Sequence, residues 1–177
     1  MTSFSELGIA PLFIEKLKTR KIETPTDIQI RVIPRILGKE HILFRSATGT
    51  GKTFAYLLPV IQNLLEDLER KPGPAALICA PTYELAAQIK KEADFLLEDS
   101  PCRAALLTGS ANISRQIDTL KKTKPLIIAG NPGRILQLER MGKLKLKAIR
   151  YIILDEADRL VSDDQLDEIR ELLSKTS

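Results

Sequence analysis

The sequence predicts an α/β fold in which a mostly parallel sheet is flanked by helices on both faces. Short apolar segments alternate with longer amphipathic ones, and the short segments are apolar on both sets of alternating positions. Continuous apolar runs of this kind are typical of strands that are covered on both faces. Strands and helices that alternate in this way form an open sheet with right-handed crossovers.

Two helices are expected before the first strand, over residues 11–20 and 26–37. Pro25 favours an extended backbone at Thr24, and Thr26 is a residue type that caps helix N-termini. The segment 24–29, which ends at Gln29, therefore leads into the second helix.

The remaining elements follow from the apolar pattern. In the segment 52–69 the apolar residues recur every three or four positions, as on one face of a helix; they are Phe54, Leu57, Leu58, Ile61, Leu64, Leu65 and Leu68. The expected strands are residues 41–45, 75–80, 103–108, 125–129 and 150–155. The other expected helices are residues 83–97, 113–121, 133–141 and 165–173.

Composition excludes several classes of protein. With 177 residues, of which 44% are hydrophobic, the chain can bury a core, so a disordered tail is excluded. No run approaches the roughly 18 apolar residues that a membrane span needs, and the start lacks the pattern of a signal peptide. We therefore expect a cytoplasmic protein with no membrane partner. One His and two Cys exclude a structural zinc site, whereas the net charge of +4 permits a nucleic-acid partner.

A glycine-rich turn lies between the first expected strand and the following helix. Its glycines let backbone N–H groups converge on a phosphate, and the helix adds the positive end of its dipole. Lys52 would reach the β- and γ-phosphates of a nucleotide, and the Thr53 hydroxyl would bind Mg²⁺. The general P-loop pattern begins with Gly, where this chain has Ser46. The expected phosphate-binding residues are Ser46, Ala47, Thr48, Gly49, Thr50, Gly51, Lys52 and Thr53.

An acidic motif, Asp155-Glu-Ala-Asp158, follows the last expected strand. Taken alone it is equally consistent with an ordinary acidic helix N-terminus. Beside a P-loop, however, Asp155 would bind Mg²⁺ and Glu156 would orient the water that attacks the γ-phosphate. Lys52, Asp155 and Glu156 are therefore the candidate catalytic residues, and Thr53 and Asp155 the candidate metal ligands.

Together these motifs resemble the DEAD-box family of ATP-dependent RNA helicases, whose first domain is a RecA-like P-loop domain. The segment 24–29, Thr-Pro-Thr-Asp-Ile-Gln, is similar to the family's Q motif, which implies that Thr24 and Gln29 contribute to adenine binding. An amide can both donate to and accept from the N6/N7 edge of adenine. The resemblance adds Phe4 and Ile22 to the adenine site, and implies ATP and Mg²⁺ as cofactors.

The resemblance also implies an RNA partner that is held through its backbone. The segments 81–85, 108–109 and 131–134 resemble the family's RNA-contacting motifs, which assigns RNA binding to Pro81, Thr82, Gly109 and Arg134. Tyr83, Ser110 and Asn131 stand where the family has Arg, Gly and Thr, and Lys21 replaces a usual Gly. Loss of a cation at Tyr83 should weaken binding to phosphate. We therefore expect nucleotide binding to be better preserved than RNA binding.

The expected organisation is one domain, with helices and the Q motif in residues 1–38 and an incomplete RecA-like core in residues 39–177. The family's Ser-Ala-Thr motif and second RecA-like domain do not occur in this sequence, so the isolated chain should be nearly inactive. The sheet could then be gapped, re-paired or completed by another chain. Alternatives to a helicase domain are a non-catalytic helicase-like scaffold and a P-loop phosphotransferase.

Overall fold

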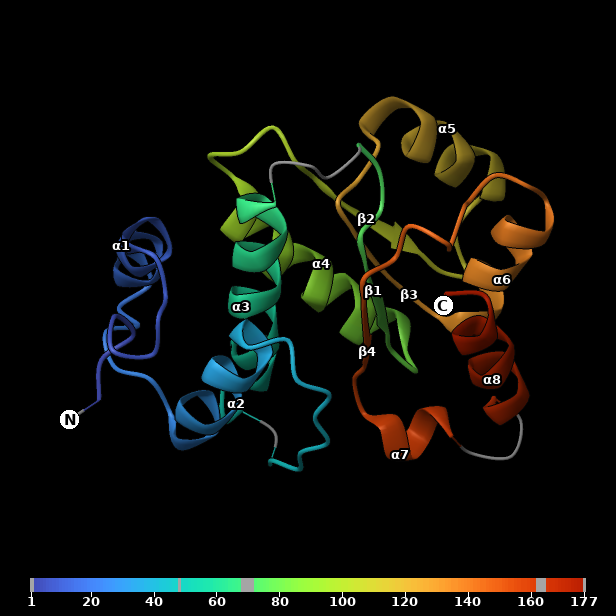
Figure 1. Ribbon diagram of the computed structural model, residues 1–177. Helices are drawn as coiled ribbons and strands as arrows, with labels where there is room; N and C mark the ends of the chain where they lie inside the picture. Colours follow the sequence, from blue (N-terminus) through green and yellow to red (C-terminus); the bar gives the residue numbers. More distant parts are fainter. Residues whose placement is uncertain (1, 48, 68–71, 162–164, 177) are drawn as a thin grey trace. The chain divides into compact units, whose positions relative to one another are not determined.

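The computed structural model describes residues 2–47, 49–67, 72–161 and 165–176 (Figure 1). The chain divides into two compact units, Met1–Arg70 and Lys71–Ser177, and each is described by itself. No helix in the described ranges has the length and apolar character that crossing a bilayer requires. The expected grouping of residues 1–38 with residues 39–177 in one domain stays a prediction.

The described residues of the first unit contain three helices at the expected positions: α1 (Pro11–Thr19), α2 (Asp27–Leu37) and α3 (Lys52–Glu66). The expected end of the third helix, at residues 68–69, lies outside the described residues. Helix α1 begins with Pro, whose missing N–H costs nothing in the first turn. At the start of α2, the Gln29 side chain accepts a hydrogen bond from the backbone N–H of Thr26, at 2.9 Å. This bond satisfies one of the N–H groups that a helix start leaves unpaired.

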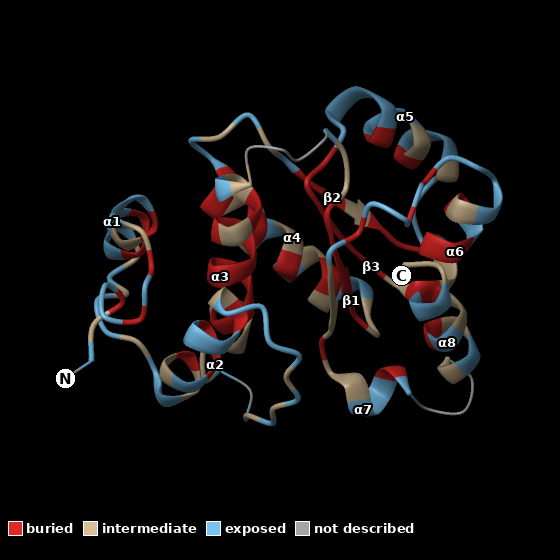
Figure 2. Ribbon diagram, in the orientation of Figure 1, coloured by how far each residue is buried: buried red, intermediate tan, exposed pale blue. Residues whose placement is uncertain are grey.

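Helix α3 organises the core of this unit, and it is buried along most of its length (Figure 2). It packs against α2. Gln62 of α3 donates to the carbonyl of Gly8 and accepts from the N–H of Ala10, both at 2.9 Å. Asn63 donates to the carbonyl of Ile36, at 3.0 Å. The buried Gln62 and the half-buried Asn63 thus fix the N-terminal segment and the end of α2 to α3, since polar groups that leave water need such partners.

The strand expected over residues 41–45 is wrong: the segment joins no sheet. Its exposure still alternates from residue to residue, as in an extended chain, and Leu43 is 96% exposed. A strand needs a neighbour that pairs with its N–H and C=O groups. All strands in the described part of the chain lie in the second unit, and each of their pairings is with another strand of that unit.

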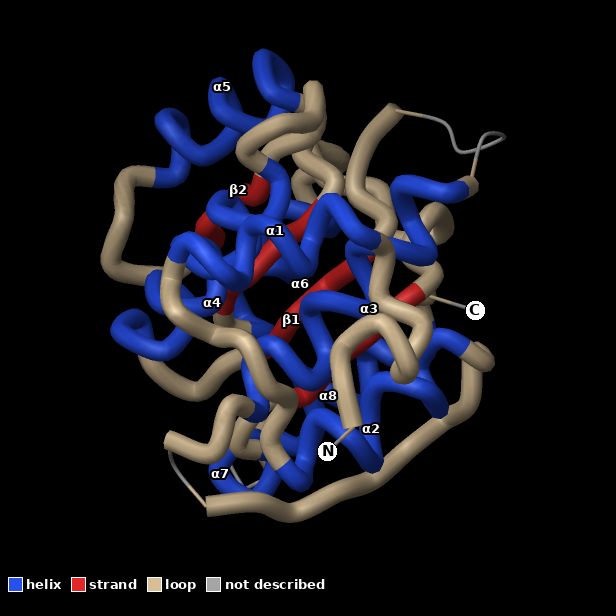
Figure 3. The backbone as a smooth tube through the Cα atoms, turned by 90° about the vertical axis from the view of Figure 1, so that its left-hand side faces the viewer, coloured by secondary structure: helices blue, strands red, loops and turns tan. Residues whose placement is uncertain are grey.

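The second unit contains a parallel sheet of four strands within the described residues: β1 (Ala76–Cys79), β2 (Ala104–Leu107), β3 (Ile127–Gly130) and β4 (Tyr151–Leu154). Their order is β2-β3-β1-β4, and each pair of neighbours is parallel; the strands are the red segments of the tube in Figure 3. The register pairs Leu107 with Gly130, Gly130 with Cys79, and Cys79 with Leu154. The four strands therefore end together, and the residues that follow them share one edge of the sheet.

Helices cover both faces of this sheet (Figure 1). They are α4 (Tyr83–Leu97), α5 (Ile113–Thr123), α6 (Pro132–Arg140), α7 (Ala157–Leu160) and α8 (Leu166–Ser174). One face, represented by Leu77 and Cys79, packs into a core with residues of α5, α6 and α8. Helix α4 contacts β2 and β3 from the other side. The expected α/β class with a parallel sheet is confirmed, while the short α7 was not predicted.

Candidate functional site

The glycine-rich turn of the first unit leads directly into α3. Gly49 and Gly51 adopt φ values of 80° and 86°, which only glycine adopts without strain. Gly51 is the N-cap of α3, so Lys52 and Thr53 are the first two residues of a 15-residue helix. A helix start presents unpaired N–H groups and the positive end of the helix dipole, an arrangement that favours a phosphate. Thr48 lies outside the described residues.

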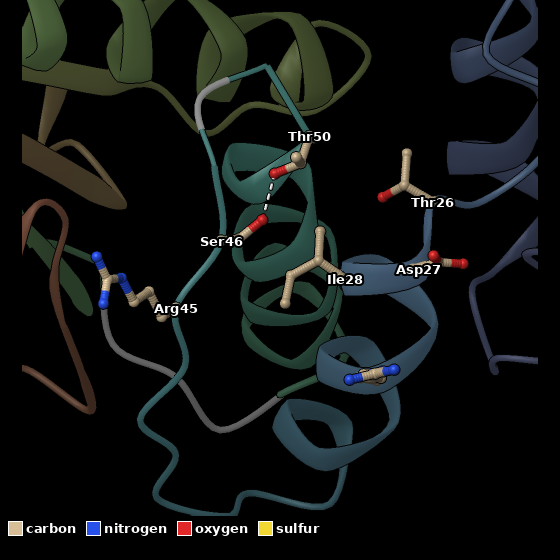
Figure 4. A pocket seen from close by; sticks show the side chains of 7 residues that line it. Thr26, Asp27, Ile28, Arg45, Ser46 and Thr50 are labelled. Atoms are coloured by element: carbon tan, nitrogen blue, oxygen red, sulfur yellow. Dashed lines mark hydrogen bonds between the residues drawn. The ribbon is translucent and has the colours of Figure 1, made fainter.

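Hydroxyl groups close this turn on itself. The Ser46 and Thr50 hydroxyls are hydrogen-bonded to each other, and Thr50 Oγ1 donates to the carbonyl of Ala47 at 2.8 Å (Figure 4). Because the Thr50 proton is used in the second bond, Ser46 is the donor in the first. Ser46, which stands where the general P-loop pattern has Gly, thus adds a hydrogen bond across the turn.

Gln29 joins the start of α2 to the same turn. Its side chain is 2% exposed, and Nε2 donates to the carbonyl of Gly51 at 3.1 Å, while Oε1 accepts from Thr26. A Cβ on Gly51 would lie 2.6 Å from this Nε2, so glycine is required for the approach. Both amide atoms retain one further hydrogen-bonding position, since an amide has two N–H groups and two lone pairs.

A pocket of about 440 Å³ lies beside the turn (Figure 4). Its volume is within the usual range for small-molecule sites. Seven residues line it: Thr26, Asp27, Ile28, Arg31, Arg45, Ser46 and Thr50. Sequence reasoning assigned no role to Asp27, Ile28, Arg31 or Arg45. The helical spacing of Asp27 and Arg31 could have indicated that they share a face of α2.

None of the expected adenine residues, Gln29 included, is among the seven that line this pocket. Phe4 is 2% exposed and belongs to the hydrophobic core of the first unit. Ile22 is half-buried and Thr24 is exposed. Their expected part in adenine binding stays a prediction.

In the second unit, the acidic motif begins where β4 ends. The N–H of Asp155 bonds to the carbonyl of Cys79 at 3.0 Å, which continues the pairing of β4 with β1. The Asp155 carboxylate, in a residue 9% exposed, accepts from the N–H of Glu156 at 2.9 Å. Glu156 has a φ of 50°, a strained value for a non-glycine residue, and its carboxylate pairs with Arg159 at 2.9 Å. Strain of this kind is concentrated at functional sites.

The donor chemistry here fits a hard cation. Within the described ranges, no group of three or more His, Cys, Asp and Glu side chains converges as a metal site. Mg²⁺ does not need one, because it binds one or two protein oxygens and completes its shell with water and phosphate. The buried Asp155 carboxylate is an oxygen donor of the required type, and so is the Thr53 hydroxyl of the first unit; that the two share one ion stays a prediction.

Three loops at the same edge of the sheet carry the expected RNA-contacting residues. Thr82 is the N-cap of α4, and its hydroxyl accepts from the N–H of Leu85 at 3.2 Å. Gly109 follows β2 and is exposed. Arg134, in the first turn of α6, donates from Nη2 to the carbonyl of Gly109 at 2.9 Å. Pro81, after β1, is half-buried.

Three departures from the family pattern, Tyr83, Ser110 and Asn131, lie at this edge. Ser110 does not have a positive φ, so the backbone there tolerates a residue with a side chain. Tyr83 is the first residue of α4 and is 50% exposed. The N–H of Asn131 bonds to the carbonyl of Leu107 at 3.1 Å, while its buried side-chain Oδ1 has no hydrogen-bond partner among the residues that the structure describes.

The structure thus brings together two sets of expected residues, each within one unit. Gln29 and the glycine-rich turn are in contact in the first unit. In the second unit, Pro81, Thr82, Gly109, Arg134, Asp155 and Glu156 follow the aligned ends of the strands or lie one turn beyond them. The convergence of Lys52 with Asp155 on one ligand stays a prediction.

Comparison with known proteins agrees with this arrangement. Residues 26–177 match the DEAD/DEAH box helicase family. The chain is 39% identical to DEAD-box ATP-dependent RNA helicase 47B of Oryza sativa subsp. japonica over 180 residues, which cover 97% of this chain and 31% of that protein. It is 38% identical to DEAD-box ATP-dependent RNA helicase CshC of Bacillus cereus over 151 residues, 85% of this chain and 38% of that protein.

A solved structure has the same fold. The crystal structure of a DEAD box protein from Methanococcus jannaschii superimposes with a TM-score of 0.89 at 32% identity, covering 100% of this chain and 47% of that one. The chain therefore spans about a third of the length of the rice relative and about half of the archaeal protein.

Proposed function

This chain belongs to the DEAD/DEAH box helicase family, and from that premise we propose that it is the first, ATP-binding domain of an ATP-dependent RNA helicase. In the full-length protein, binding and hydrolysis of Mg²⁺-ATP would be coupled to unwinding or remodelling of RNA duplexes. The single observation that carries the proposal is the contact of Gln29 with Gly51, because it joins the Q motif to the phosphate-binding turn.

On the nucleotide side, Lys52 would neutralise the β- and γ-phosphates against the N–H groups of the turn from Ser46 to Thr53. Thr53 and Asp155 would hold Mg²⁺, which supplies charge neutralisation at the phosphates when bound. Glu156 would orient the attacking water. The buried position of Asp155 and the strained backbone of Glu156 support these assignments.

Selectivity for adenine would come from Gln29. Its amide retains one free N–H and one free lone pair after its bonds to Gly51 and Thr26, and adenine offers the complementary acceptor and donor. Guanine has a carbonyl where adenine has an amino group, so the same amide would reject it. Phe4, Ile22 and Thr24 would complete the adenine site.

The RNA side would be the edge that carries Pro81, Thr82, Gly109 and Arg134. In the described part of the chain, the N–H groups of Gly109 and Ser110 make no hydrogen bond, and both residues are exposed. Exposed N–H groups of consecutive loop residues suit a phosphate and carry no sequence preference. The further partner would be a second RecA-like domain of the full-length protein.

We also propose a cytoplasmic location. One relative, from Arabidopsis thaliana, is named as mitochondrial, so fluorescence imaging of the tagged full-length protein is the direct check.

Competition binding tests the nucleotide assignment. A fluorescent ADP should bind the chain, and ATP should displace it better than GTP. Gln29→Ala should reduce the preference for ATP over GTP about tenfold, because one discriminating hydrogen-bonding group is lost. Gln137→Ala, which removes an exposed amide from α6, is the matched control and should keep the preference. An unchanged preference in Gln29→Ala would remove the residue from this role, and no displacement by millimolar ATP would contradict the proposed function.

A further inference from the structure

Arg134 is the expected phosphate-contacting cation of the RNA side, yet two of the five N–H groups of its guanidinium already bind carbonyls of the protein. Nη2 donates to the carbonyl of Gly109 at 2.9 Å, and Nη1 donates to the carbonyl of Ala111 at 3.0 Å. The two bonds come from the two terminal nitrogens of one planar group, a geometry that Arg provides and Lys does not. Arg134 therefore spans the loop between β2 and α5 from its position in α6.

Helix α5 also binds a carbonyl of this loop. Gln116 of α5 donates from Nε2 to the carbonyl of Thr108 at 2.9 Å, and both residues are buried. The N–H of Ala111 also bonds to the Thr108 carbonyl, at 3.3 Å. Three carbonyls of the loop 108–111 are thus occupied by donors from the protein.

The loop N–H groups are in the opposite situation. Those of Gly109 and Ser110 lack a hydrogen-bond partner among the described residues, in an exposed segment. Because three of its four carbonyls are bonded to the protein, the loop 108–111 has most of its acceptors withdrawn from an approaching anion. Its N–H groups are then the part of the backbone that remains available to a phosphate.

We propose that Arg134 is a positioning residue: it binds the carbonyls of Gly109 and Ala111 and so fixes the loop 108–111 for phosphate binding by its N–H groups. This inference rests on the proposed function, and it changes the expected role of Arg134 from a phosphate ligand to a support of the phosphate-binding loop. Preorganisation of this kind raises affinity because the loop is not ordered at the moment of binding.

Two variants separate the two roles. Arg134→Gln removes the charge and the planar fork, and Arg134→Lys keeps the charge but loses the fork. A positioning residue predicts the same result for both: binding of a fluorescent single-stranded RNA weakens about tenfold, and the dependence of affinity on salt keeps its slope. A phosphate ligand predicts that only Arg134→Gln lowers the slope, by about 0.7 for a single strand.

A second measurement does not involve RNA. Backbone ¹⁵N order parameters of Gly109, Ser110 and Ala111 should be near about 0.85 in the parent chain and fall below about 0.6 in both Arg134 variants. Arg115→Gln is the matched control: it removes an exposed Arg from α5 without touching the loop carbonyls, and should leave these order parameters unchanged. The melting temperature of each variant shows whether it is folded.

The outcomes are distinct. Loosened loop residues with an unchanged salt slope support the proposal. A slope that falls in Arg134→Gln alone overturns it, as do order parameters that stay unchanged in both variants. If the parent chain binds no RNA, the proposed function fails, and order parameters that fall only in the Arg134 variants still support Arg134 as the residue that fixes the loop.

Discussion

Cys79 illustrates how burial decides the chemistry of a single side chain. It lies in β1 at 0% exposure, and burial raises the pKa of its thiol from 9.0 to about 12. The thiolate is the nucleophilic form of cysteine. At pH 8, iodoacetamide should therefore modify the half-buried Cys102 and leave Cys79 unmodified until denaturant is added. Intact mass measurement before and after denaturation gives the result, and modification of Cys79 at a similar rate in the folded chain would contradict it.

The same pKa predicts the direction of a pH effect on stability. Below pH 9 the thiol is protonated in both the folded and the unfolded chain, so it contributes nothing that changes with pH. Between pH 9 and about 12 only the unfolded chain ionises, and the free energy of unfolding falls by about 1.4 kcal/mol per pH unit. Urea titrations of the parent and of Cys79→Ala should therefore converge as the pH rises in this window.

The role of a residue could be predicted where it follows from the residue type and its position in a motif. It could not be predicted where it depends on a contact between a side chain and a segment distant in the sequence. The glycines of the turn 46–53 predicted a tight turn, and the structure shows that Gly49 and Gly51 adopt a left-handed backbone there. Nothing in the sequence placed the Gln29 amide on the carbonyl of Gly51 or the Arg134 guanidinium on two carbonyls. Those contacts depend on how helices α2 and α6 lie against loops from other parts of the chain.

Among the elements, strand β3 requires glycine at position 130, whereas helix α6 tolerates a larger residue at position 133. A Cβ on Gly130 would lie 2.1 Å from the carbonyl oxygen of Leu107, in the backbone of the neighbouring strand β2. A Cβ on Gly133, in α6, would lie 2.7 Å from Oε1 of Glu168, at the end of a flexible side chain. Gly130→Ala must therefore displace a paired strand, whereas Gly133→Ala needs only a rotation of Glu168.

We expect Gly130→Ala to lower the free energy of unfolding by about 3 kcal/mol and Gly133→Ala to change it by less than about 1 kcal/mol. Alanine also has a higher helix propensity than glycine, which offsets part of the cost at position 133. Urea denaturation followed by circular dichroism measures both variants. Equal losses in the two would show that the close approach of Gly130 to β2 is not decisive.

Local pattern identified most elements but could not supply their partners. The apolar runs of β1, β2, β3 and β4 and the equally apolar segment 41–45 have the same signature in the sequence. Only the first four pair with one another, while residues 41–47 lie outside the sheet and alternate in exposure. Hydrogen-bond pairing is a property of two segments, so a single-segment pattern predicts extended backbone more securely than it predicts a strand.

At the scale of the whole molecule, topology explains why half of the site could be foreseen. Parallel strands end at the same edge, so motifs after β1, β2, β3 and β4 had to gather there, and they do. The glycine-rich turn belongs to the other compact unit, Met1–Arg70. The distance between this turn and the acidic motif after β4 depends on how both units are arranged. The register of the strands within the second unit does not determine it.

That division gives a prediction for the polypeptide of 177 residues on its own. It spans 31% of the rice relative. The resemblance to DEAD-box helicases implies that arginines of a second RecA-like domain would complete the hydrolytic site of the full-length protein. An arginine finger contributes on the order of 10³ to 10⁵ in rate, and single-stranded RNA would stimulate hydrolysis only where both domains can close on it. Phosphate release from ATP by this polypeptide should therefore stay near the uncatalysed background with or without RNA, and a labelled duplex should remain paired.

Glu156→Gln should leave this background unchanged, whereas the same substitution in a full-length protein should abolish its RNA-stimulated turnover. RNA-stimulated turnover by the 177 residues alone, lost in Glu156→Gln, would mean that the two units contain a complete hydrolytic site.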